Sequence, residues 1–223
     1  MKKYNVKILE SFFVTHDVKC FIVERPEDYT FKPGQATEVS INKNGWKEEK
    51  RPFTFTNLPE DNFLQFIIKS YPEHKGVTKE IHTLDVGDEL ILHDVFGTIT
   101  YQGKGLFIAG GAGITPFISI FRNLKKTDRL IGNRLIFANK TKEDIILQKE
   151  LGGLFGNDLI NILSEENHDD FQHGTVTKDL LKKNMNEQAE NFYVCGPEPM
   201  NEAVIEQLTD LGITQKSIIK EGL

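Results

Sequence analysis

Apolar residues in the first hundred positions come in short runs, and residues typical of turns separate these runs. The runs cover residues 6–14, 19–23, 36–41, 52–56, 63–69 and 89–92, with Pro, Gly, Asn and Asp between them. Runs of this length and spacing predict a small antiparallel sheet that closes into a barrel. One short helix is expected at about residues 78–84, before the turn at residues 85–88.

After residue 103 the pattern changes to strands that alternate with helices. Strands are expected at 105–109, 134–138, 158–163, 191–195 and 216–220, and helices at 115–126, 142–151, 177–183 and 197–211. Repeated alternation of this kind predicts a doubly wound parallel sheet. The sequence therefore predicts two domains, an N-terminal antiparallel β-barrel (residues 1–102) and a C-terminal α/β domain (residues 103–223).

Length, composition and charge exclude several classes of protein. The chain has 223 residues, of which 39% are hydrophobic, and this predicts a globular fold of one large or two small domains. The formal net charge of -6 has the wrong sign for a protein that mainly binds nucleic-acid phosphates. The longest uncharged run, residues 105–121, contains four glycines and is shorter than the roughly 20 residues that span a bilayer, so no membrane insertion is expected.

The two cysteines, Cys20 and Cys195, are too few for a disulfide framework, a four-cysteine iron–sulfur cluster or a cysteine zinc site. We therefore expect no metal and a reducing compartment. The first residues run directly into an alternating pattern, without the apolar core of a signal peptide. These features predict a cytoplasmic protein.

A glycine-rich turn follows the first strand of the α/β half and leads into a helix. It reads Gly110, Gly111, Ala112, Gly113, Ile114, Thr115 and Pro116. Glycines let a backbone approach a pyrophosphate, and a helix N-terminus offers N–H groups to the anion, although a turn without a ligand is the alternative. Pro116 replaces the third glycine of the common dinucleotide fingerprint, and the next strand ends without an acidic residue for a ribose 2′-hydroxyl.

Three further segments carry candidate chemistry. They are Arg51, Pro52, Phe53 and Thr54 in a barrel strand, Gly76, Val77 and Thr78 before the short helix, and Cys195, Gly196, Pro197 and Met200 after the last long strand. Arg51 could clamp a phosphate or a carboxylate, or lie at a strand edge beside core phenylalanines. Thr78 could help to bind an anion or simply cap the helix. Cys195 could border a ligand at the carboxyl edge of the sheet, or be a small buried residue.

In this order the four segments resemble motifs of the ferredoxin-NADP reductase family, which includes cytochrome b5 reductases and oxygenase reductases. The resemblance covers nearly the whole chain. Residues 51–54 match the family's Arg-x-Tyr/Phe-Ser/Thr flavin motif, residues 76–78 its second flavin motif, and residues 110–116 and 195–200 its two nicotinamide motifs. Ala112 departs from the pattern, because many members have Thr or Ser there. The chain also ends in Leu223, where many members have an aromatic residue.

The resemblance implies an FAD cofactor, with FMN less favoured, and NADH or NADPH as the hydride donor. By the same resemblance, Arg51 neutralises a flavin phosphate, Phe53 lies against the flavin ring, and the Thr54 hydroxyl bonds near flavin N5. Thr54 and Cys195 are thus the candidate catalytic residues. Candidates for binding the flavin pyrophosphate are Gly76, Val77 and Thr78. Pro52, in the first motif, is a further cofactor-binding candidate. Candidates for binding the nicotinamide dinucleotide are Gly110, Gly111, Ala112, Gly113, Thr115, Pro116, Cys195, Gly196, Pro197 and Met200.

The implied function is that of a monomeric NAD(P)H-dependent flavoprotein reductase. It passes hydride to flavin N5 and then single electrons to a separate ferredoxin, flavodoxin, oxygenase or cytochrome. Lys43, Lys47 and Lys50 could form a basic rim for an acidic carrier, or belong to a solvated loop. Residues 138–145 resemble the NADH-using branch, although Lys140 or Lys142 could pair with a 2′-phosphate. The alternatives are a flavin-binding regulatory or electron-transfer subunit and a free-flavin reductase.

Overall fold

The computed structural model describes residues 2–71, 76–97, 99–185 and 190–220. The chain divides into two compact units, Met1–Gly97 with Thr115–Arg122, and Thr98–Ile114 with Asn123–Leu223. Each unit is described by itself below. The single boundary at residues 102/103 stays a prediction.

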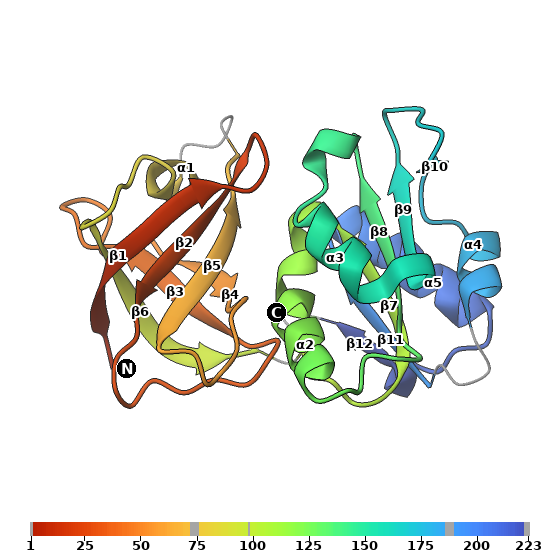
Figure 1. Cartoon of the computed structure of the whole chain (residues 1–223), viewed down its shortest axis with the longest axis horizontal. Helices are drawn as coiled ribbons and strands as arrows, with labels where there is room; N and C mark the ends of the chain where they lie inside the picture. Colours follow the sequence, from red (N-terminus) through yellow and green to blue (C-terminus); the bar gives the residue numbers. More distant parts are fainter. Residues whose placement is uncertain (1, 72–75, 98, 186–189, 221–223) are drawn as a thin grey trace. The chain divides into compact units, whose positions relative to one another are not determined.

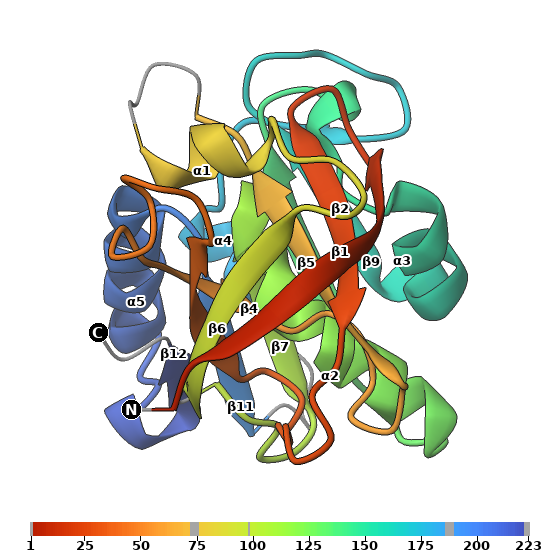
Figure 2. The ribbon, with the colours of Figure 1, turned by 90° about the vertical axis from the view of Figure 1, so that its left-hand side faces the viewer.

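The first unit is a curved antiparallel sheet with one short helix (Figures 1 and 2). Its strands are β1 (Tyr4–Phe13), β2 (Val18–Glu24), β3 (Ala36–Ile41), β4 (Arg51–Thr54), β5 (Phe63–Lys69) and β6 (Glu89–Phe96), and its helix is α1 (Val77–Ile81). The order is β4-β3-β6-β1-β2-β5, and the edge strands β4 and β5 contact each other. Just past β4, Thr56 N donates to Gln65 O at 2.9 Å. The predicted antiparallel barrel is confirmed.

Alternation of apolar and polar residues explains why these strands form a sheet with one buried face. In β1, Val6 and Ile8 are buried, whereas Asn5 and Lys7 are exposed. Pro52 has no backbone N–H to donate, and it lies in β4, an edge strand, where this is tolerated. The strand therefore places the Arg51–Thr54 segment at the margin of the sheet.

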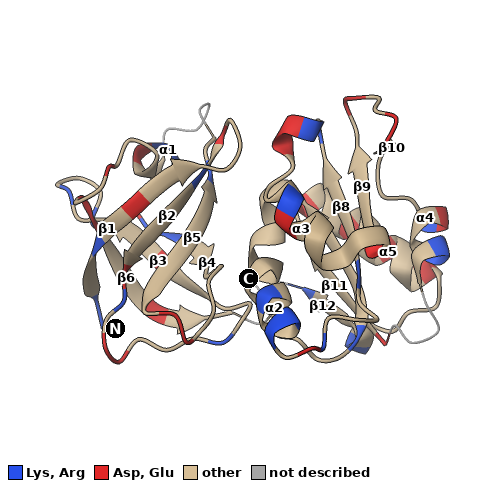
Figure 3. Cartoon of the chain, in the orientation of Figure 1, with Lys and Arg blue, Asp and Glu red and all other residues tan. Residues whose placement is uncertain are grey.

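The start of the long helix α2 (Thr115–Lys126) groups with the first unit through polar contacts. Ser119 Oγ donates to Asn57 O at 2.6 Å, and Arg122 Nη1 donates to Thr56 O at 2.8 Å and to Gln65 Oε1 at 2.7 Å. These side chains satisfy backbone carbonyls that follow β4. The last turn of α2 is basic, with Lys125 and Lys126, which suits the negative end of the helix dipole (Figure 3).

The second unit is built on a parallel sheet. Its strands are β7 (Gly105–Gly110), β8 (Arg134–Asn139), β9 (Leu159–Leu163), β10 (Gln172–His173), β11 (Asn191–Cys195) and β12 (Ile218–Lys220), in the order β10-β9-β8-β7-β11-β12. Every pair in this sheet is parallel. The helices that follow the strands include α3 (Gln148–Phe155), α4 (Lys178–Asn184) and α5 (Glu198–Asp210). The predicted doubly wound sheet is confirmed.

One helix begins later than the sequence predicts. Residues 142–151 were expected to be helical, but a 3₁₀ turn forms at Lys142–Asp144 and α3 begins only at Gln148. Asp144 Oδ2 accepts hydrogen bonds from Thr141 N at 2.9 Å and Thr141 Oγ1 at 2.8 Å, which closes a capping box around a single turn. Leu147 then has a left-handed backbone, with φ at 53°, and this separates the turn from α3.

Within the described residues, no helix is both long enough and apolar enough to cross a bilayer.

Candidate functional site

Two of the four candidate segments come together at the point where the strand order of the parallel sheet reverses. From β7 the chain proceeds to β8 and β9 on one side, whereas β11 lies on the other side. Gly110 ends β7 and Cys195 ends β11, with Cys195 paired in register with Ala109. Both turns therefore leave the same carboxyl edge at a topological switch point, where open α/β sheets bind ligands.

The two turns touch through their backbones. A Cβ atom on Gly113 would overlap the Cys195 carbonyl oxygen and lie 2.5 Å from the Cys195 carbonyl carbon and 2.7 Å from Gly196 Cα. A Cβ on Gly110 would overlap Met200 Sδ and lie 3.0 Å from Pro197 Cδ. Glycine is required at position 113 because a side chain there would force the two backbones apart, whereas at position 110 the Met200 and Pro197 side chains would have to move.

Between them, the chain after β7 forms a 3₁₀ turn, Gly111–Ile114, that leads directly into α2. Gly111 has φ at 50°, in the left-handed region, and Pro116 occupies the first turn of α2, where a missing N–H costs little. Gly111, Ala112 and Gly113 are partly exposed. The turn has the glycine content and helix-start geometry that anion-binding turns use.

The other two segments lie in the first unit. Phe53 packs against the same hydrophobic cluster in which Val77, the first residue of α1, is buried. Gly76 is the N-cap of α1 and makes no side-chain cap bond. Thr78 is therefore not the N-cap of α1, and the alternative that this residue simply caps the helix is wrong.

The strand β4 carries a polar atom that fits a cofactor. Thr54 Oγ1 is buried and has no hydrogen-bond partner among the described residues, and such atoms are rare in folded proteins. The Arg51 side chain is exposed, and its Nη1 donates to Lys50 O at 2.6 Å. A hydroxyl that lacks a partner, a flexible cation and the aromatic ring of Phe53 on one short strand match the donor set that a phosphate-bearing flavin needs.

Carboxylates that sequence reasoning missed lie beside the end of β8. Glu165 Oε1 pairs with Lys140 Nζ at 2.9 Å, and Glu165 N donates to Lys140 O at 2.9 Å. Glu166 Oε2 accepts from Lys142 N at 2.7 Å. The pairing with Glu165 raises the pKa of Lys140. Glu165 and Glu166 lie in the loop after β9, and they meet the end of β8 because parallel neighbours end at the same edge of the sheet.

The predicted basic rim is partly neutralised. Lys43 Nζ lies 3.4 Å from Asp88 Oδ1, and Lys50 Nζ lies 3.3 Å from Glu38 Oε2. Lys47 is exposed in the same loop. The two paired lysines contribute little net charge to an acidic partner.

A cleft of about 230 Å³ lies in the second unit, away from the turns after β7 and β11. Its lining includes Lys125, Ile131, Phe155 and Asp158, near the residues that begin β8 and β9. Ligands of doubly wound sheets bind at the opposite, carboxyl ends of the strands. This cleft is therefore separate from the β7 and β11 turns.

Comparison with known proteins agrees with this arrangement. Residues 1–90 match the family model of an FAD-binding domain, and residues 107–206 match that of an oxidoreductase NAD-binding domain. NADH--cytochrome b5 reductase 1 of Arabidopsis thaliana is 30% identical over 92% of this chain and 79% of its own length. The reductase component of propane 2-monooxygenase of Rhodococcus jostii (strain RHA1) is 29% identical over 86% of this chain, which spans 55% of that relative's length.

A solved structure shows the same fold. A ferredoxin NADP⁺ reductase from Neisseria gonorrhoeae with bound FAD and NADP superposes with a TM-score of 0.83 at 21% identity, over 99% of this chain and 98% of that one. The order of the two family models along the chain is the order of the two sheets. The chain therefore belongs to the ferredoxin-NADP reductase-like family of oxidoreductases, with an FAD-binding domain followed by an NAD-binding domain.

Proposed function

We propose that this protein is an FAD-dependent NAD(P)H oxidoreductase that delivers single electrons to a separate acceptor protein. The observation that carries the proposal is the backbone contact between the glycine turn after β7 and the Cys195–Gly196 turn after β11. When bound, the flavin supplies the conversion of a two-electron hydride donor into one-electron transfers. The protein's own residues supply binding and orientation, which set the rate of such a transfer.

Each candidate residue has a task that its surroundings support. Arg51 is exposed and can turn toward a flavin phosphate, Thr54 can donate the hydroxyl that lacks a partner among the described residues, and Phe53 can support the ring. On the other unit, Gly113 lets the glycine turn pack against the Cys195–Gly196 turn, and Gly111, where a Cβ would meet nothing within 4 Å, leaves open space for a dinucleotide backbone. These assignments are proposals that rest on motif positions and local geometry.

An anaerobic titration tests the proposal directly. The purified protein should show a flavin absorbance band that NADH or NADPH bleaches. A band that neither nucleotide bleaches would replace the reductase by a flavin-binding regulatory or electron-transfer subunit. Loss of all flavin on gel filtration, with activity restored by added riboflavin or FMN, would instead support a free-flavin reductase.

NADH is the expected donor. Of the two lysines after β8 that could bind a 2′-phosphate, Lys140 pairs with Glu165 through its ammonium, and Glu166 accepts from the backbone N of Lys142. The negative charge of these two carboxylates would repel that phosphate. We expect kcat/KM for NADH to exceed that for NADPH by at least about tenfold, since one lost charge-assisted pair costs this much. Steady-state kinetics with both donors measures the ratio, and equal values would contradict the assignment.

Replacing Cys195 with serine tests the nicotinamide side. Cys195 is 6% exposed and ends β11 against the glycine turn, so the change alters the chemistry of the side chain while nearly keeping its size. We expect slower flavin reduction by NADH in stopped flow, with unchanged flavin content. An unchanged reduction rate would return Cys195 to a packing role.

The acceptor is proposed from the relatives. A reductase component and a cytochrome b5 reductase both serve separate acceptors by their names, so we propose an oxygenase component, a cytochrome or a small carrier such as a ferredoxin or flavodoxin for this chain. A monomeric state and a cytoplasmic location stay predictions. Size-exclusion chromatography with light scattering measures the first of these.

A further inference from the structure

The strand β6 contains a histidine with unusual surroundings. His93 is only 1% exposed, and both of its ring nitrogens are buried without a hydrogen-bond partner among the described residues. Its backbone is held firmly, because Thr37 Oγ1 accepts from His93 N at 3.2 Å and donates to His93 O at 3.0 Å. A fixed imidazole without partners for its nitrogens is costly, and it calls for an explanation.

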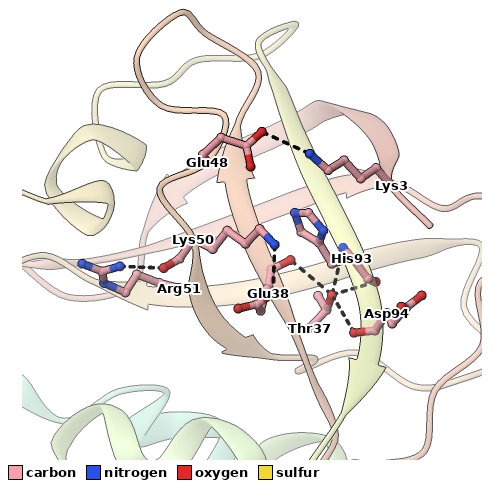
Figure 4. Close-up of polar contacts among 8 residues, drawn as sticks. All are labelled: Lys3, Thr37, Glu38, Glu48, Lys50, Arg51, His93 and Asp94. Atoms are coloured by element: carbon pink, nitrogen blue, oxygen red, sulfur yellow. Dashed lines mark hydrogen bonds and ion pairs between the residues drawn. The ribbon is translucent and has the colours of Figure 1, made fainter. Parts of the chain in front are cut away.

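Two ion pairs enclose the ring (Figure 4). On one side Lys3 Nζ pairs with Glu48 Oε1 at 3.1 Å, and on the other Lys50 Nζ pairs with Glu38 Oε2 at 3.3 Å. These four charged groups come from the N-terminal segment, the loop before β4, and β3, and within the described part of the chain they are the charges that act on the ring. Burial, followed by the positive charge of Lys50, lowers the pKa of His93 from its ordinary value, which favours the neutral ring.

The Lys50–Glu38 ion pair is connected to the flavin motif at residues 51–54. The Lys50 side chain is held by Glu38, and the Lys50 carbonyl accepts the hydrogen bond from Arg51 Nη1 at 2.6 Å. Lys50 is thus in contact with Glu38 through its side chain and with the Arg51 guanidinium through its backbone carbonyl. Figure 4 shows the ring of His93 beside this pair.

We propose that His93 is a positioning residue that makes flavin binding sensitive to pH. Protonation of the ring places a buried positive charge next to Lys50, and that charge draws the Glu38 carboxylate away from the Lys50 ammonium. The Lys50–Arg51 segment then loses its anchor, and Arg51 is less well placed for the flavin phosphate. The proposal rests on the proposed function, since it takes Arg51 as the phosphate ligand.

The sign of the effect follows from proton linkage. The unfolded chain binds a proton on His93 at a higher pH than the folded chain does, so the neutral ring favours the native loop above about pH 6.5. This stabilisation is lost as the pH falls from about 6.5 through the folded-state pKa. Flavin affinity should therefore fall on acidification.

NMR of the full chain without added flavin tests the coupling by itself. The His93 ring and the backbone amides of Lys50 and Arg51 should titrate with one shared midpoint below about pH 6.5. His93→Gln should abolish the titration of the two amides. Should that variant fail to fold, Glu38→Gln replaces it: the ring should still titrate, and the amides should not. Amides that do not follow the ring in the wild type would overturn the proposal.

A matched control is His82→Gln. The pKa of His82 is also lowered by burial, but its Nε2 bonds to the Ile68 carbonyl at 2.8 Å, away from the Lys50–Glu38 pair. In this variant the amides of Lys50 and Arg51 should titrate as in the wild type. If the amides lost their titration in His82→Gln, the effect would come from a general loss of packing in the first unit, and the proposal would be overturned.

Flavin affinity supplies the second readout. The Kd for FAD of the wild type should rise about tenfold between about pH 7.5 and about pH 5.5, and that of His93→Gln should stay nearly constant. The same pH dependence in both proteins would overturn the proposal. If no FAD binds at any pH while the amides still follow the ring, the proposed function fails and the proton coupling of His93 to the Lys50–Arg51 segment is confirmed.

Discussion

Replacing Gly113 with alanine is expected to lower kcat/KM for NADH by about 100-fold or more while the protein keeps its flavin. The new methyl group would overlap the Cys195 carbonyl oxygen and approach Gly196 Cα to 2.7 Å. Both obstacles are backbone, so neither can rotate away as a flexible side chain would. The turns after β7 and β11 must therefore separate, and a displacement of about 1 Å at a hydride-transfer site costs about two orders of magnitude in rate.

The matched control for this prediction is Gly153→Ala in α3. A Cβ there meets nothing within 4 Å, and alanine favours a helix over glycine by about 1 kcal/mol. Flavin content and kcat/KM should equal those of the wild type. If Gly113→Ala were as active as this control, the two turns would not form the nicotinamide site.

Replacing Arg51 with alanine is expected to weaken FAD binding by about 1.5–3 kcal/mol, which is the range for a hydrogen bond to a charged group. This corresponds to a Kd about 10- to 150-fold higher. Arg51 is exposed on the edge strand β4 and its Nη1 donates to the neighbouring Lys50 carbonyl, so its removal should cost the apoprotein little stability. Fluorescence titration of the apoprotein with FAD measures the affinity.

Lys47→Ala serves as the control, because Lys47 is an exposed cation in the loop just before β4. It removes the same charge and should leave the Kd for FAD unchanged. Equal FAD affinity in Arg51→Ala and the wild type would show that Arg51 is not the phosphate ligand. A similar loss in both variants would mean that the loop attracts the flavin through its overall charge alone.

Much of this fold could be predicted, because its elements follow from local patterns. Alternating residues such as Asn5, Val6, Lys7 and Ile8 mark a half-buried strand wherever they occur. The glycine turn at residues 110–113, between an apolar strand and a helix, likewise carries its meaning in a few consecutive positions. The helix predicted at residues 142–151 forms only from Gln148 onward, and the prediction was wrong for residues 142–147 because helical periodicity does not reveal a left-handed residue such as Leu147.

The C-terminal segment lies outside the described residues, and so do the roles considered for it. Leu223 stands where many members of the family have an aromatic residue, and Glu221 resembles the carboxylate that some relatives place near the flavin; both roles stay predictions.

The order of the elements, the two-domain class and the four motifs could be predicted from the chain alone, because periodicity and turn chemistry act between near neighbours. The contacts between distant groups became visible only in the folded chain. In the folded chain Gly113 lies against the Cys195 carbonyl, Glu165 pairs with Lys140, and His93 lies between two ion pairs. Such contacts depend on strand order and register, which no local pattern encodes, since pairing a strand with a different neighbour would preserve its periodicity and change every partner.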